Sequence, residues 1–162
     1  MSINTGLTTT LSIDDTASAA TKKVTTVDAS ASTGAVTYVG DAEAAAILSG
    51  AGADKITLAT ATLVASTGVT AISASASTGA GNDVVTVTTT GSGTTTINAG
   101  AGDDTVNVTT RGTGALTVNL GDGVDKFTSA VAVTAGDSID AGAGVDTLSL
   151  ALVGSANIGA FA

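Results

Sequence analysis

Regularly spaced aspartates are the residues of this 162-residue chain that could do chemistry. Four of them recur every 21 residues and a fifth lies 29 residues before the first of these, in the order Asp54, Asp83, Asp104, Asp125 and Asp146. Each closes a Gly-x-Gly-x-Asp turn. Glycine lets the backbone turn tightly, so that carbonyl oxygens converge beside the carboxylate. Hard oxygen donors of this kind are the ligands that Ca²⁺ prefers.

The candidate calcium ligands are the five aspartates together with backbone carbonyls of the turns that carry them. The glycines of the last four turns are Gly79, Gly81, Gly100, Gly102, Gly121, Gly123, Gly142 and Gly144. A single Gly-x-Gly-x-Asp is equally well explained as an ordinary β-turn, because Gly and Asp are common turn residues. Five copies, each followed by an apolar residue two positions after the Asp, favour calcium. The neighbouring Asp103, Asp122 and Asp140 are expected to be solvated or to support the ligands.

The elements that must position these turns are short strands. A 21-residue unit with too few apolar residues to bury a face alone is typical of a stacked solenoid. We expect an all-β fold, a right-handed parallel β-roll or β-solenoid, with a narrow interior because aromatic residues make up only 2% of the chain. Alternation predicts inward side chains at Val85, Val87, Val106, Val108, Phe127, Ile97, Val118 and Ile139, and outward columns at Thr86, Asn107, Thr128 and Ser149 and at Asn98, Asn119 and Asp140.

The repeat divides the chain into residues 1–48, an N-terminal cap with coils that lack calcium turns, and residues 49–162, the calcium-binding coils with a C-terminal cap. Ile47 lies seven residues before Asp54, the same offset as Ile97 before Asp104, and is therefore expected to point inward from a strand. The longer spacing after Asp54 predicts a loop around Leu63–Val69. The segment Asp14–Lys23 could form a short helix or a loose cap.

Composition argues against several functions. A net charge of −9 with only five Lys and Arg argues against nucleic-acid binding. The chain has no His and no Cys, so nucleophilic machinery is missing and we expect no enzyme activity. No stretch approaches a membrane span, and Met1–Ala20 lacks the pattern of a signal peptide. Secretion by a route without such a signal, or origin in a longer chain, both remain open.

The turns resemble those of the RTX calcium-binding domains of type I secreted proteins, over Ser49–Ser149. The Thr-, Ala- and Gly-rich coils with segments such as Asp28–Gly34 are most similar to alphaproteobacterial S-layer proteins. The resemblance implies Ca²⁺ binding, an extracellular cell-surface location and self-association into a lattice or longer chain. The alternative is a calcium-binding segment of a secreted RTX adhesin or ice-binding protein. One departure is that the first glycine of the family motif is replaced in every turn, by Ser49, Thr78, Ala99, Leu120 and Ala141.

Overall fold

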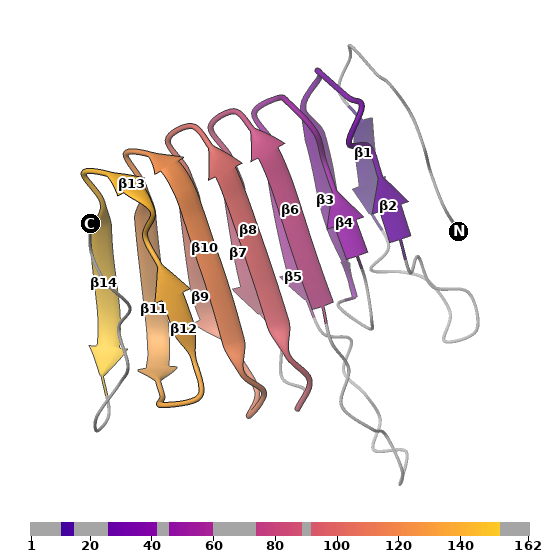
Figure 1. Cartoon of the computed structure of the whole chain (residues 1–162). Coiled ribbons are helices and arrows are strands. Elements are labelled where there is room, and N and C mark those ends of the chain that lie inside the picture. The colour runs from indigo at the N-terminus through magenta and orange to yellow at the C-terminus, as the bar shows by residue number, and fades with distance from the viewer. Residues whose placement is uncertain (1–10, 15–25, 42–45, 60–73, 89–91, 153–162) are drawn as a thin grey trace, which may run out of the picture.

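The computed structural model describes residues 11–14, 26–41, 46–59, 74–88 and 92–152 (Figure 1). Within these ranges the chain forms strands and turns only, and no helix there is long and apolar enough to cross a membrane. The strands are β1 (Leu11–Asp14), β2 (Thr26–Asp28), β3 (Val36–Asp41), β4 (Ala46–Leu48), β5 (Lys55–Ala59), β6 (Ala74–Ala80), β7 (Val84–Thr88), β8 (Thr95–Ala101), β9 (Thr105–Thr110), β10 (Leu116–Gly123), β11 (Lys126–Val133), β12 (Ser138–Asp140), β13 (Ala143–Gly144) and β14 (Thr147–Leu152).

The strands form two parallel sheets that face each other across a thin core (Figure 1). One sheet has the order β1-β3-β5-β7-β9-β11-β14, and the other has the order β12-β10-β8-β6-β4-β2, with β13 beside β10. Because successive strands alternate between the sheets, each coil contributes to both. The chain is a parallel β-solenoid of about five turns, and the predicted fold class is confirmed.

The 21-residue period sets the register between coils. Val106 pairs with Val85 on one side and with Phe127 on the other. Every predicted inward residue is at most 1% exposed. Leu148, which pairs with Phe127 in the next coil, is only half-buried, because its strand β14 lies at the edge of the sheet. Val, Ile and Leu side chains make up most of the core, and Tyr38 and Phe127 are its largest members. Facing sheets pack only about 10 Å apart, which leaves little room for more aromatic side chains.

The less regular early coils keep the same register. Ile47 is 1% exposed and pairs with Val27 and with Ala76, as its spacing predicts. Lys55 pairs with Val84, so the turns before them are aligned although 29 residues separate their aspartates. The predicted loop around 63–69 lies outside the described residues. Of the segment 14–23 only Asp14 is described, at the end of β1.

Glycine allows the coils to approach closely at the corner that carries the aspartates. Gly100 has φ +115°, and a Cβ atom there would lie 1.9 Å from the carbonyl oxygen of Gly79. Gly121 has φ +106°, and its Cβ would lie 1.7 Å from the carbonyl oxygen of Gly100. Any larger residue would both adopt a disfavoured backbone conformation and strike the backbone of the preceding coil. This column of glycines stacks the turns directly on one another.

Candidate metal centre

The five predicted aspartates stack along one edge of the solenoid, which we call the acidic corner: Asp54, Asp83, Asp104, Asp125 and Asp146 with the glycines of their turns. The first four are only 1–2% exposed, whereas Asp146 is half-buried. The structure therefore brings together all the aspartates that the repeat singled out, in one column running across the coils.

Each carboxylate in this column joins its own coil to the preceding one. The Oδ1 atom of Asp104 accepts a hydrogen bond of 2.8 Å from the backbone N–H of Asp83. The same bond recurs along the column, from Asp54 N–H to Asp83 (2.7 Å), from Asp104 N–H to Asp125 (2.8 Å) and from Asp125 N–H to Asp146 (2.9 Å). At the first step Asp54 accepts from the N–H of Val36 (2.7 Å). One oxygen of each aspartate thus has a defined structural partner.

The second carboxylate oxygen lacks one. The Oδ2 atoms of Asp54, Asp83, Asp104 and Asp125 are buried and have no hydrogen-bond partner among the described residues. A buried carboxylate oxygen without a donor or a cation is costly, because it has lost its hydration without replacement. Such an oxygen calls for either a proton or a bound cation. This observation fits the calcium ligands predicted from the sequence.

The hydroxyls that replace the first motif glycine distinguish the coils. Ser49 and Thr78 lie five residues before Asp54 and Asp83, close enough for their hydroxyls to lower the pKa of the corresponding carboxyl. The Thr78 hydroxyl itself donates to the carbonyl of Ala99 (2.8 Å) and the Ser49 hydroxyl to the carbonyl of Thr78 (3.3 Å), so neither is the hydrogen-bond partner of the Oδ2 atom of its aspartate. At Asp104 the corresponding residue is Ala99 itself, which carries no hydroxyl. Leu120, the corresponding residue before Asp125, has none either, so Asp104 and Asp125 lack the hydroxyl that lies near Asp54 and Asp83.

Burial raises the pKa values of the acidic corner. It raises the pKa of Asp83 to about 7 and that of Asp104 to about 6, although the hydrogen bonds from the N–H groups of the preceding coil offset part of the effect. Repulsion between neighbouring carboxylates of the column adds to the rise. The pKa values of Asp54 and Asp125 are also raised, again chiefly by burial. A nearby cation favours the ionised form of a carboxyl, so it would offset the cost of burying these charges.

The residues just before the buried aspartates also link the coils, but their side chains accept hydrogen bonds from the coil that follows and not from the coil that precedes. Asn82 Oδ1 accepts from the N–H of Asp103 in the next coil (3.0 Å), and Asp103 Oδ1 accepts from the N–H of Val124 (2.9 Å). Asp103 is exposed, as are Asp122 and Asp140, in agreement with the expectation that they are solvated. Asp103 supports its neighbouring turn through a hydrogen bond to the backbone.

The carboxylates form a line and not a cluster. No group of three or more acidic or other ligating side chains that could hold a metal occurs within the described ranges. A cation at the acidic corner would therefore need backbone carbonyls as well as carboxylates. Several of these carbonyls already accept hydrogen bonds between coils, such as Gly50 from Ala80 N–H (2.9 Å) and Asp122 from Gly102 N–H (2.9 Å). A carbonyl oxygen has a second lone pair, so this does not prevent it from binding a cation.

A sixth aspartate, Asp137, occupies a comparable position at the opposite corner, and it is not among the residues predicted from the repeat. Its Oδ1 accepts from the N–H of Leu116, 21 residues earlier (2.9 Å). Its Oδ2, unlike those of the acidic corner, accepts from both the N–H (2.7 Å) and the hydroxyl (3.1 Å) of Thr134. Arg111 then donates to Oδ1 at 2.6 Å. Burial alone would raise the pKa of Asp137, but the hydrogen bonds from Thr134, Arg111 and Leu116 outweigh it and lower the pKa.

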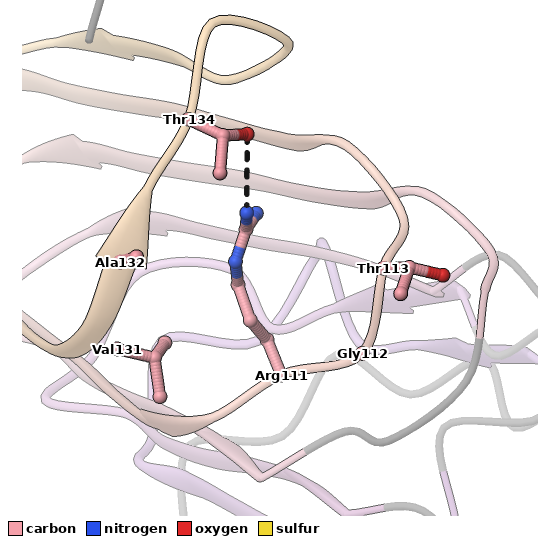
Figure 2. A pocket seen from close by; sticks show the side chains of 6 residues that line it. All are labelled: Arg111, Gly112, Thr113, Val131, Ala132 and Thr134. Carbon is pink, nitrogen blue, oxygen red and sulfur yellow. Dashed lines mark hydrogen bonds between the residues drawn. The ribbon is translucent and has the colours of Figure 1, made fainter. Parts of the chain in front are cut away.

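Figure 2 shows Arg111 extended between two loops toward Thr134. Its Nη1 also donates to the carbonyl of Gly114 (3.3 Å), and a guanidinium nitrogen contacts the Thr134 hydroxyl (3.4 Å). A groove of about 380 Å³ lies beside it, lined by Arg111, Gly112, Thr113, Val131, Ala132 and Thr134. We call Arg111, Thr134 and Asp137 the Arg111 corner. The sequence marks Arg111 only as the single arginine of the chain, and the counterpart of Asp137 one period earlier is the apolar Leu116.

Comparison of the chain with protein-family models, with curated proteins and with solved structures finds no match.

Proposed function

We propose that the chain is a structural, calcium-dependent β-solenoid of a secreted bacterial surface protein, and that it serves in a surface layer. The observation that carries this proposal is the set of four buried Oδ2 atoms, at Asp54, Asp83, Asp104 and Asp125, that have no hydrogen-bond partner among the described residues. Calcium would neutralise adjacent carboxylates and link successive coils. Its binding energy would then be part of the folding energy.

The carboxylates of the acidic corner and the carbonyls of its glycine turns are the groups that would hold calcium. This donor set consists of oxygen atoms only, and Ca²⁺ accepts six to eight such ligands in irregular geometry. Mg²⁺ demands near-octahedral geometry and keeps several of its waters, so it fits a line of backbone carbonyls less well. The column of carboxylates would also explain why the turns repeat in strict register.

The Arg111 corner supplies an internal comparison for this assignment. There a buried carboxylate likewise accepts the N–H of the preceding coil, and the chain provides a guanidinium to balance its charge. In the described part of the acidic corner no ion pair provides a comparable cation, and Lys126, next to Asp125, is exposed. A cation from solution would fill at four positions the role that Arg111 fills at one.

Calcium titration followed by circular dichroism and calorimetry tests the proposal. Addition of Ca²⁺ to chelator-treated protein should raise the β-sheet signal and the unfolding temperature, and Mg²⁺ at the same concentration should do so far less. A spectrum and an unfolding temperature that a strong calcium chelator leaves unchanged would refute calcium dependence.

The assembly part of the proposal rests on the edges of the sheets. Among the described residues β14 pairs only with β11, and β1 pairs only with β3. Edge strands present unpaired backbone groups that readily accept another strand. These edges lead us to expect calcium-dependent self-association. A cell-surface location and export by a type I route are proposed only on the resemblance of the turns to those of RTX domains. Light scattering at rising concentration tests the self-association, and a strict monomer in saturating calcium would contradict it.

A further inference from the structure

The two corners of the solenoid differ in how their buried carboxylates are neutralised. The four buried aspartates of the acidic corner each keep one oxygen without a partner among the described residues, whereas Asp137 receives donors on both oxygens. The Asp137 side chain is fully buried, and that of its partner Arg111 is 11% exposed. A buried pair of this kind, with its hydrogen bonds satisfied, depends little on the ions in solution.

The pair joins two successive coils. Arg111 follows β9 and precedes β10, while Asp137 follows β11 and precedes β12. Asp137 also accepts the N–H of Leu116 at the start of β10, and it fixes the N–H of Thr134 in its own turn. Four donors from both coils therefore converge on one carboxylate. Breaking this contact would leave a buried charge unpaired, which is strongly destabilising.

We propose that Arg111 and Asp137 form a clamp that holds the β9–β10 coil against the β11–β12 coil independently of metal. Calcium removal would then loosen the acidic corner first, while the opposite corner of these coils stays in register. The contrast between the corners rests on the proposed calcium binding, whereas the clamp itself rests only on the contacts of Arg111 and Asp137.

Amide hydrogen exchange of the full chain, measured residue by residue by NMR, tests this proposal. The N–H groups of Asp83 and Asp104 report on the acidic corner, and that of Leu116 reports on the clamp. On transfer from saturating calcium to a strong chelator, exchange at Asp83 and Asp104 should accelerate roughly tenfold more than exchange at Leu116. Equal acceleration at all three positions would overturn the clamp. Unchanged exchange at Asp83 and Asp104 would refute calcium dependence, and the clamp would then be decided by the variants.

Arg111→Gln removes the charge and keeps a hydrogen-bonding side chain. It should accelerate exchange at Leu116 by roughly tenfold in the chelator, and Arg111→Lys should recover part of the loss because it restores the charge without the planar fork. Lys126→Gln removes the same charge from an exposed position and is the matched control. If Arg111→Gln leaves the protection of Leu116 equal to that in Lys126→Gln, the clamp does not exist.

Discussion

The carboxylate of Asp104 accepts a hydrogen bond of 2.8 Å from the backbone N–H of Asp83 in the preceding coil, while its other oxygen is buried without a partner among the described residues. The hydrogen bond to Oδ1 holds the side chain in place, and the Oδ2 atom is left without a donor. Asp104 thus has two roles, a hydrogen bond between coils and the proposed binding of calcium. Different substitutions at this position separate the two contributions to stability.

Asp104→Ala should lower the calcium stoichiometry by about one or two ions and cost on the order of several kcal/mol of unfolding free energy in calcium, if metal binding is folding energy. The reason is that Asp104 faces a carboxylate on each side of the column. Asp104→Asn keeps an oxygen for the N–H of Asp83 and should lose calcium binding with a smaller structural loss. Isothermal titration calorimetry and chemical denaturation measure both effects.

Asp140→Asn is the control for these variants, since Asp140 is an exposed aspartate outside the column. Its effect on stability should stay within about 0.5 kcal/mol. Calorimetric titrations that are the same for the Asp104 and Asp140 variants would mean that the repeat reflects turn chemistry alone.

The pH dependence of stability should have opposite signs with and without calcium. In chelator, burial raises the folded-state pKa of Asp83 from 3.8 to about 7, so its contribution to stability is fully present below 3.8 and is lost as pH rises toward 7. Bound calcium favours the ionised carboxylates and lowers their pKa values, so that stability is present at neutral pH and lost on acidification. Thermal unfolding midpoints measured from about pH 4 to about pH 8 in both conditions test this. Curves with the same slope would rule out a cation at these carboxylates.

Ala99→Thr should lower the pKa of Asp104 by placing a hydroxyl where Thr78 places one beside Asp83. Ala99→Val has nearly the same shape without the hydroxyl and separates the hydrogen bond from the added volume. The next coil accommodates Leu120 at this position, fully buried, so the larger side chain fits the column. Carboxyl ¹³C titrations in chelator should give a lower Asp104 pKa in the Thr variant than in the Val variant. Equal pKa values would show that this side chain does not reach the carboxylate.

Gly100→Ala should destabilise the solenoid by more than about 1 kcal/mol, because the residue has φ +115° and its new Cβ would lie 1.9 Å from the carbonyl oxygen of Gly79. Gly136→Ala, where nothing lies within 4 Å of the added atom, should change stability little. Urea denaturation of both variants at fixed calcium compares them directly. Similar midpoints would mean that the stacked glycines do not limit the approach of the coils.

Periodicity predicted the part of the fold that repeats. The 21-residue spacing was enough to predict the inward residues from Val85 to Ile139. It fixes the register between coils, and a shift by one residue would turn the apolar side chains of a strand to the outer face. It also predicted the aspartate column and the inward position of Ile47. The register of Asp54 with Asp83 survives eight extra residues because the strands after both turns pair directly, Lys55 with Val84.

What does not repeat could not be predicted in this way. Asp137 has Leu116 and Thr95 as its counterparts in the preceding coils. An aspartate that occurs at this position in one coil only departs from the repeat, and the repeat therefore could not predict a site there. Its partnership with Arg111 depends on the course of two loops of different length. The hydrogen bonds of the aspartates to backbone N–H groups were also not predicted, because the sequence indicates which coils stack but not where a carboxylate points.

The column of aspartates has a direction, since each side chain binds the backbone of the coil before it. A coil therefore brings with it the carboxylate that satisfies its predecessor, and it offers its own N–H to the coil that follows. Duplication of residues 84–104 would insert Asp103 and Asp104, two Gly-x-Gly pairs and one strand for each sheet, and it would keep the hydrogen bond between aspartate and backbone N–H at the new junctions. Stability in such a stack is a sum of coil terms and nearest-neighbour terms. The molecule can therefore lengthen or shorten by whole coils, and its length is free to vary without redesign of its core.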